Sequence, residues 1–162
     1  MAFWKRQKSK KAEPVFRGPD QSDPQTFIRS FCFDYKEWND YCIQISDSTA
    51  STVKSKTTNL LSAFYSVFIG AYAVPQIKLQ LISYGSNATF DPERLTFGSV
   101  DIKEHQIRQQ FFIKSTHSHD KDEYVAELIR DEAGEMQLQQ IFYIDPFPED
   151  YAEDETPMLP CL

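Results

Sequence analysis

Apolar residues recur at steps of three and four between Phe27 and Ile45, and this spacing fits only one kind of local structure. An α-helix with about 3.6 residues per turn brings all of them to one face. Asp23 and Pro24 stand just before the run, where a capping side chain and a first-turn proline are favoured. The spacing therefore predicts an amphipathic helix that begins near residue 24. Its apolar face consists of Phe27, Phe31, Tyr35, Trp38, Cys42 and Ile45.

A second helix is predicted between Val53 and Pro75, after a polar break at 46–51. It must end before Pro75, because the proline ring disfavours a helical conformation at the preceding residue. The segment 77–83 alternates apolar and polar residues, which is compatible with a strand or with the end of a helical arm. Two helices with wide apolar faces need a large surface to cover.

The rest of the chain has the pattern of an antiparallel strand meander. The predicted strands are 95–103, 107–116, 123–131 and 135–145, with a polar turn at 117–122 and a tight turn at 131–134. A phase slip at Gly98 and Ser99 predicts a β-bulge in the first strand. The last strand is expected to place Met136, Leu138, Gln140, Phe142 and Ile144 on one face. Helices followed by a meander are typical of an α+β fold with helices on one face of a sheet.

The length of 162 residues fits one domain. We expect residues 24–147 to form it, with a flexible basic arm at 1–23 and an acidic C-terminal tail at 148–162. The three cysteines include no CxxC pair, which favours a reducing compartment. The longest apolar stretch, 60–74, falls short of the ~20 residues that span a bilayer, and the N-terminal residues do not resemble a signal peptide. The expected location is cytoplasmic, without membrane contact.

The order of two helices, a turn-rich SYGSNATFDPE segment and a strand meander resembles the cone-shaped roll of the nuclear transport factor two-like, or cystatin-like, fold. Within that fold the chain looks like the immunity proteins that neutralise bacterial polymorphic toxins. The resemblance covers roughly residues 25–145. It is carried by Trp38, Tyr41 and Cys42, by Ser83, Tyr84, Gly85, Ser86, Phe90, Asp91, Pro92 and Glu93, and by the hairpin from Tyr124 to Tyr143.

The resemblance implies a chain without catalysis or cofactor that occludes a cognate toxin domain, for example a nuclease. A net charge of −7 suits a basic protein partner and disfavours nucleic acid. The segment 83–97 could be a lid packed over the core or part of a recognition rim. A homodimer through the sheet is compatible with this reading. The expected toxin-binding residues are Tyr84, Phe90, Asp91, Glu93, Glu149, Asp150, Glu153, Asp154 and Glu155.

The alternative is a pocket-bearing enzyme, of the isomerase or dehydratase kind, or a ligand binder on the same fold. Proton transfer at carbon needs a base of tuned pKa beside an oxyanion donor. The candidates for these roles are Asp34, Tyr35, Tyr41 and His105. Asp34 stands beside the apolar stripe and is expected to face water. Metal ligation is conceivable for His117, His119, Asp120 and Asp122. All four fall in one short polar turn, which favours a solvated hairpin tip.

Overall fold

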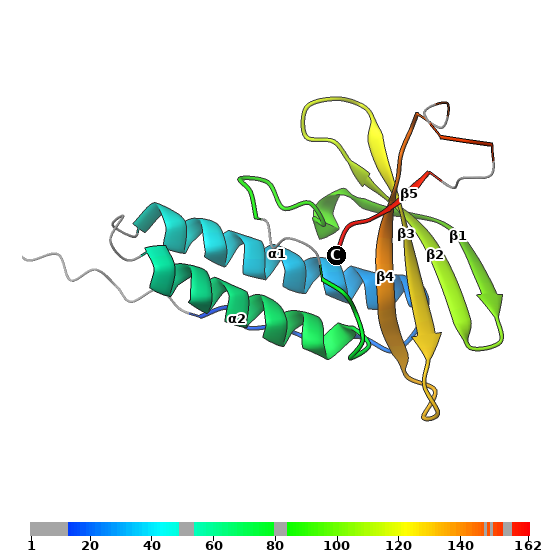
Figure 1. Cartoon of the computed structure of the whole chain (residues 1–162), viewed down its shortest axis with the longest axis horizontal. Helices are drawn as coiled ribbons and strands as arrows, with labels where there is room; N and C mark the ends of the chain where they lie inside the picture. Colours follow the sequence, from blue (N-terminus) through cyan, green and yellow to red (C-terminus); the bar gives the residue numbers. More distant parts are fainter. Residues whose placement is uncertain (1–12, 49–53, 80–83, 148, 150, 154–156) are drawn as a thin grey trace, which may run out of the picture.

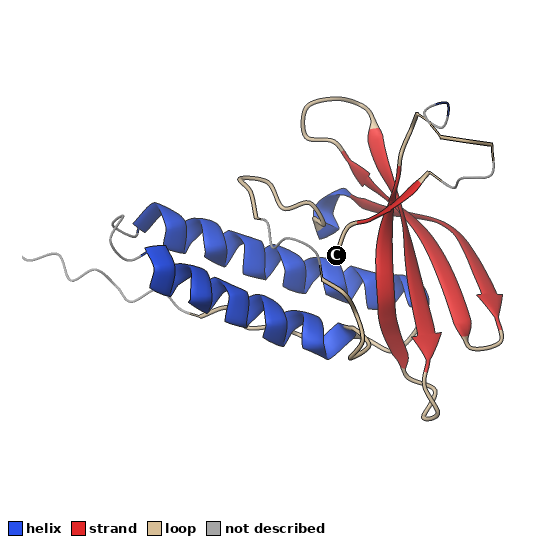
Figure 2. Ribbon diagram, viewed as in Figure 1, coloured by secondary structure: helices blue, strands red, loops and turns tan. Residues whose placement is uncertain are grey.

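The computed structural model describes residues 13–48, 54–79, 84–147, 149, 151–153 and 157–162. Its elements are α1 (Pro24–Ser48), α2 (Lys54–Tyr72), the 3-10 helix η2 (Pro92–Arg94), β1 (Leu95–Lys103), β2 (Gln106–Lys114), β3 (Lys121–Arg130), β4 (Met136–Ile144) and β5 (Met158–Pro160). The strands form one antiparallel sheet in the order β1-β2-β3-β4-β5. Both long helices lie on the same side of this sheet (Figure 1, Figure 2). The predicted α+β class and the meander order are confirmed.

Helix α1 begins where its capping residue predicts. The backbone N–H of Thr26 donates to Oδ1 of Asp23 at 2.7 Å, and the backbone N–H of Phe27 donates to the Asp23 carbonyl at 2.9 Å. The predicted apolar face is buried from Phe27 to Cys42, and Ile45 packs at its margin. This face forms one side of a core that is rich in aromatic rings.

Helix α2 covers α1 and ends three residues before Pro75, as predicted. Its last residue, Tyr72, packs edge-on against Phe31 with the ring centroids 5.5 Å apart. The backbone N–H of Val74 then donates to the carbonyl of Leu138 in β4 at 2.9 Å. Residues 77–79 are neither helix nor strand, and residues 80–83 lie outside the described part of the chain. Neither α1 nor α2 is long and apolar enough to cross a membrane.

The predicted bulge in β1 is present. The register of β1 against β2 shifts between Phe97 and Val100, which leaves Gly98 and Ser99 as the irregular residues. After the bulge, Val100 and Ile102 remain 46% and 56% exposed. The core therefore ends at the beginning of β1, and the far end of this strand lies at the margin of the molecule.

Position 98 requires glycine, because the backbone there lies against the side chain of Gln110. A Cβ at Gly98 would overlap the side-chain amide of Gln110, which accepts from the backbone N–H of Ser99 at 3.1 Å and donates to Glu123 at 2.6 Å. We expect Gly98→Ala to lower the free energy of unfolding by about 1–2 kcal/mol, measured by urea denaturation. Gly70→Ala is the control, because it has open space around its Cβ and should not destabilise. A Gly98→Ala protein as stable as the parent would contradict this packing.

Strand β4 does not keep the uniform alternation of faces that we predicted for it. It contributes one residue more than β3 to their pairing, and Gln139 is this extra residue. The bulge exchanges the two faces of the strand, so that Ile141 is buried. The expected placement of Gln140, Phe142 and Ile144 on the core face is therefore wrong. No glycine marks this bulge, and its only sign in the sequence is the pair of adjacent polar residues Gln139 and Gln140.

Residues 13–23 lie against the helices, where a flexible arm was expected. The ring of Phe16 packs on Phe68 with the centroids 5.5 Å apart. The backbone N–H groups of Arg17 and Gly18 donate to the buried carboxylate of Asp34 at 2.8 and 2.9 Å. The segment is held by backbone N–H groups and by the side chains of Phe16 and Gln21, which follow no apolar period that the sequence could reveal. The remainder of the expected arm, residues 1–12, lies outside the described part of the chain.

The C-terminal end also differs from the expected acidic tail. Met158–Pro160 pairs as β5 with the end of β4, and the side chain of Leu162 is 3% exposed. In Figure 1 this red segment runs from β5 toward α1. The tail residues that the structure describes are thus part of the folded body.

Two segments distant in sequence, and Cys161 directly after β5, cover the rest of the free edge of β4. Their contacts are Gln21 side chain to the Met136 backbone (2.7 and 3.1 Å), the Val74 N–H to the Leu138 carbonyl (2.9 Å), and the Cys161 N–H to the Ile141 carbonyl (3.0 Å). Residues distant in sequence thereby satisfy the polar backbone groups that an edge strand otherwise leaves open.

Candidate functional site

One row of paired side chains crosses the helix-facing side of the whole sheet. In register order it consists of Phe97, Phe111, Tyr124, Tyr143 and Leu159, one from each strand. We call this row the aromatic ladder. Its central rings, Phe111 and Tyr124, are stacked with the centroids 5.3 Å apart and an interplanar angle of 17°. The next pair, Tyr124 and Tyr143, lies at 5.6 Å.

The ladder is covered unequally along its length. Phe90, which is 1% exposed, covers the middle. At the β1 end, the guanidinium of Arg29 lies 5.3 Å from the ring centroid of Phe97. At the opposite end Tyr143 is half-buried and Leu159 is 43% exposed. The ladder thus has one end occupied by a cation and one end open.

The open end forms a hollow of about 460 Å³, which we call the tyrosine pocket. Its lining residues are Tyr35, Thr89, Phe90, Asp122, Tyr124, Tyr143, Leu159, Pro160 and Cys161. Tyr35 and Tyr124, each 6% exposed, form the floor with Phe90, and Asp122 is exposed at the rim. Four elements and the loop before η2 therefore build one hollow.

The tyrosine pocket is aromatic and negatively charged. Among its lining residues, all of which belong to the described chain, one is acidic and none is basic. Burial raises the pKa of the Tyr35, Tyr124 and Tyr143 hydroxyls, and the nearby charge of Asp122 raises the pKa of the latter two further. The hydroxyls are consequently neutral at physiological pH. The pocket offers ring faces, neutral phenols and one carboxylate.

The SYGS segment, residues 83–86, is held to α1 by an amide clamp. Nδ2 of the buried Asn39 donates to the Gly85 carbonyl at 2.9 Å, and the Gly85 N–H donates to Oδ1 of Asn39 at 3.0 Å. Tyr84 hydrogen-bonds Ser46 through its hydroxyl and is 38% exposed. Ser83 lies outside the described residues. This part of the segment is anchored and not free.

The FDPE part is also built into the fold. Phe90 lies in the core, so the expectation that it forms an exposed toxin contact is wrong. Asp91 accepts from the backbone N–H of Glu93 at 2.9 Å and pairs with Arg94 at 3.4 Å, which fixes η2. Glu93 is exposed. Of the two roles considered for this segment, a packed lid agrees with Phe90 and Asp91, while Tyr84 and Glu93 keep an exposed side.

The expected acidic contacts near the C-terminus are only partly described. Glu149 and Glu153 are exposed, and Asp150, Asp154 and Glu155 lie outside the described residues. The loop that carries Glu149 and Glu153 begins at Asp145, whose carboxylate accepts from the Tyr151 hydroxyl at 2.8 Å. This loop connects β4 with β5 and leaves the sheet at the end of β4 (Figure 1). Tyr143, which lines the tyrosine pocket, lies near the same end of the strand.

The four residues considered for catalysis lie in different places. Asp34 is fully buried, against the expectation that it faces water, and accepts from the Tyr72 hydroxyl at 2.6 Å besides two backbone N–H groups. Tyr35 lines the tyrosine pocket, and Tyr41 packs on Phe64 with the centroids 5.2 Å apart. The structure does not bring these side chains together as a base and an oxyanion donor.

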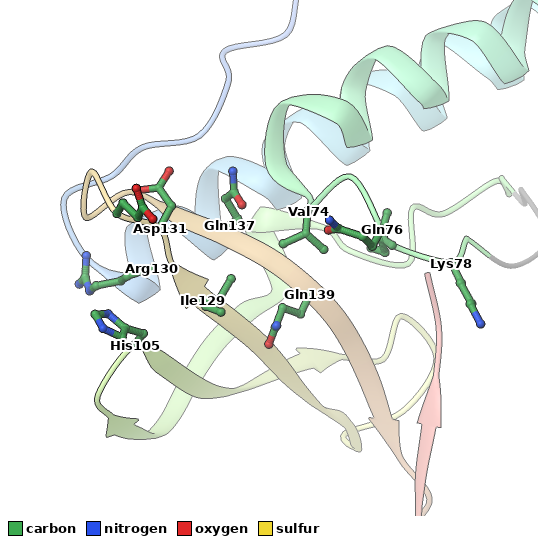
Figure 3. A pocket seen from close by; sticks show the side chains of 11 residues that line it. Val74, Gln76, Lys78, His105, Ile129, Arg130, Asp131, Gln137 and Gln139 are labelled. Carbon is green, nitrogen blue, oxygen red and sulfur yellow. The ribbon is translucent and has the colours of Figure 1, made fainter.

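His105 lines a separate and larger hollow, of about 620 Å³, at the other end of the sheet. Figure 3 shows His105 beside Arg130 at one end of this hollow and Lys78 at the opposite end. Between them Gln137 and Gln139 extend from β4. These polar groups are spread along a strand and do not converge on one point, so this hollow is the weaker candidate.

Three of the side chains considered as metal ligands lie on the turn between β2 and β3, and the fourth, Asp122, is the second residue of β3. The four are His117, His119, Asp120 and Asp122, and all are exposed. Ser118 donates to Asp120 at 3.1 Å within the turn. In the described ranges no three His, Cys, Asp or Glu side chains are grouped so as to hold a metal ion. The positions of His117, His119 and Asp120 agree with the hairpin-tip interpretation, whereas Asp122 is paired with Ile113 in the sheet.

Sequence reasoning named Tyr35, Phe90 and Asp122 in separate roles, but it did not predict that they meet Tyr124, Tyr143 and Leu159 in one pocket. Tyr124 and Tyr143 were recognised only as part of a hairpin, and Leu159 was assigned to a tail. Their meeting depends on the bulge at Gln139, which sets Tyr143 opposite Tyr124. A hairpin aligned from its turn without this bulge puts Phe142 there instead. The aromatic content of both strands was the only available signal.

The buried thiol of Cys42 and the buried phenol of Tyr65 make the stability of the fold sensitive to high pH. Burial raises the pKa of the Cys42 thiol from 9.0 to about 12, and that of Tyr65 from 10.0 to about 12. Both groups bind protons more tightly in the folded state, so their contribution to stability is complete below pH 9 and declines above it. We expect the urea midpoint to fall progressively between pH 9 and pH 12. Cys42→Ala and Tyr65→Phe should each reduce this decline, and a constant midpoint up to pH 11 would contradict it.

Comparisons with protein-family models, with curated protein sequences and with solved structures find no match to this chain.

Proposed function

We propose that this protein is a binding module of the immunity type, which neutralises a toxin domain by covering its active site. The observation that carries the proposal is the tyrosine pocket, an aromatic hollow with a carboxylate at its rim and no basic lining residue within the described chain. Interfaces are enriched in tyrosine, and buried aromatic anchors supply much of their affinity. A surface of this kind suits a basic polypeptide.

The charge of the chain supports the same partner. The net charge is −7, and Asp122, Asp145, Glu149 and Glu153 belong to the segments at the pocket end of the sheet. Such a field accelerates the approach of a basic domain such as a nuclease, and salt weakens the effect. The order of two helices, η2 and a meander supports the further proposal that the roll is an open variant of the nuclear transport factor two-like fold.

The decisive experiment is co-expression with the product of the adjacent gene. We expect that product to carry a domain that kills cells, and we expect this chain to rescue them and to co-purify with the domain. The absence of both rescue and co-purification would contradict the proposal.

The rate of association with the toxin and its salt dependence test electrostatic steering. Reversing the charges of Glu149, Asp150, Glu153, Asp154 and Glu155 together should slow association with the toxin by about tenfold at low salt and flatten the salt dependence. Unchanged association kinetics would leave these acids without a role in binding.

The alternative reading, a small-ligand binder or pocket enzyme, relies on the same hollow. Its volume of about 460 Å³ falls within the range of ligand sites. Turnover or tight binding of a neutral metabolite in the tyrosine pocket, without any toxin partner, would favour that reading.

A further inference from the structure

The aromatic ladder already binds one cation within this chain. At its β1 end, the guanidinium carbon of Arg29 lies 5.3 Å from the ring centroid of Phe97. Cations within about 6 Å of an aromatic centroid are attracted by the negative ring face. Phe97 is one terminal ring of the ladder, and Tyr143 is the last ring at the other end. Of the two ends of the aromatic ladder, therefore, only the β1 end holds a cation among the residues that the structure describes.

The open end has a carboxylate beside its rings. Asp122 pairs with Ile113 on the core-facing side of the sheet and stands two residues before Tyr124 on the same face. Its charge reaches both phenols, because it contributes to raising the pKa of Tyr124 and of Tyr143. A cation seated on these rings would therefore also face a carboxylate. No basic residue lines the pocket within the described ranges, so this negative potential is uncompensated there.

We propose that the tyrosine pocket binds one cationic side chain, an arginine or a lysine, of the partner protein. The charged group lies over the rings of Tyr143 and Tyr124 and faces Asp122, while Leu159 contacts the aliphatic part of the side chain. The identification of the partner as a toxin domain rests on the proposed function, whereas the cation preference of the pocket stands on its own residues. Arginine fits best, because its planar guanidinium stacks on rings and forms paired hydrogen bonds with a carboxylate.

Two matched peptides test the pocket directly. The ¹⁵N-labelled full chain is titrated with N-acetyl-Gly-Arg-Gly-amide and with the same peptide carrying citrulline, which keeps the shape and removes the charge. We expect the arginine peptide to shift the amide signals of residues 122–124, 143 and 159–161, and to bind about fivefold or more tightly than the citrulline peptide. Equal binding of the two peptides, or shifts confined to other residues, would overturn the proposal.

Substitutions separate the contribution of the Asp122 charge to binding from that of the Tyr143 ring. Asp122→Asn should weaken the arginine peptide about threefold to tenfold, and Tyr143→Leu should weaken it at least as much, whereas Tyr143→Phe keeps the ring face and should bind nearly as the parent. Glu132→Gln, an exposed acid at the opposite end of the sheet, controls for the lost charge and should leave affinity unchanged. Asp122 is exposed, so Asp122→Asn should unfold at the parental temperature. A parental affinity in both Asp122→Asn and Tyr143→Leu would contradict the site.

The outcome with the toxin distinguishes this inference from the proposed function. If the adjacent-gene toxin is neutralised equally by the parent and by Asp122→Asn, and the arginine peptide does not bind, the cation site is wrong and the immunity function stands. If the peptide binds in the pocket as expected but no adjacent-gene product is neutralised, the cation site stands and the immunity function is wrong. Loss of both toxin binding and peptide binding in Asp122→Asn supports the two together.

Discussion

Replacing Phe90 by alanine should lower the free energy of unfolding by about 3–5 kcal/mol, the cost of removing a large ring from a packed core. The side chain is 1% exposed. Its ring contacts Phe31 (5.7 Å between centroids), Tyr35 (4.9 Å), Phe111 (6.2 Å) and Tyr124 (5.2 Å). Removing it leaves a cavity between α1 and the aromatic ladder. Urea denaturation followed by tryptophan fluorescence measures the loss, since Trp38 is also buried in this core.

Phe147→Ala is the matched control for Phe90→Ala. Phe147 is 58% exposed, so the same change of side chain should alter stability by no more than about 0.5 kcal/mol. The comparison also decides between the two roles first considered for the FDPE segment. A Phe90→Ala protein that keeps parental stability but loses its partner would show that Phe90 is a contact residue and would contradict the packed arrangement.

Replacing Asp34 by alanine should cost about 3 kcal/mol or more. The carboxylate is fully buried and accepts from the N–H groups of Arg17 and Gly18 and from the hydroxyl of Tyr72. Alanine would leave three donors without an acceptor, each costing about 1–3 kcal/mol unless water replaces it. The segment before α1 should also lose its attachment. Amide hydrogen exchange should therefore accelerate at Arg17 and Gly18, in addition to the fall in stability.

Asp40→Ala separates the loss of a charge on α1 from the loss of the buried acceptor. Asp40 pairs with Lys36 at 2.9 Å, and both side chains are substantially exposed, so its removal should cost at most about 1 kcal/mol. Equal effects of Asp34→Ala and Asp40→Ala would contradict the role given to Asp34. Unchanged exchange at Arg17 and Gly18 in Asp34→Ala would do the same.

Periodicity was sufficient for the elements that bury one face and was insufficient where backbone contacts decide the structure. The stripe from Phe27 to Ile45 predicted α1 and its start, because burial of one helical face imposes a spacing that a reader can recognise. Asp34 stands beside that stripe and was expected in water, yet it is buried. Its donors are two N–H groups and a hydroxyl from other segments, and contacts of this kind leave no pattern in the residues near Asp34.

The two bulges show the same limit within the sheet. Glycine and a phase slip announced the bulge at Gly98, whereas the bulge at Gln139 has no glycine and is marked only by the adjacent polar pair Gln139 and Gln140. The tyrosine pocket depends on the second bulge, because only then does Tyr143 join Tyr124 on the core face. A site built from one residue of each strand requires every register to be known, and local sequence does not contain that information.

The covered edge of β4 restricts how a partner can engage the sheet. Many peptide-binding proteins accept an extra strand along an exposed sheet edge, a mode known as β-augmentation. Here β5 is three residues long and ends in Pro160, which has no N–H to donate. Two other segments and Cys161, directly after β5, occupy the rest of the β4 edge. Among the described strands, only β1 offers a long free edge, and its pairing with β2 is interrupted at Gly98. A polypeptide that binds at the β4–β5 end must therefore be recognised by its side chains and not by its main chain.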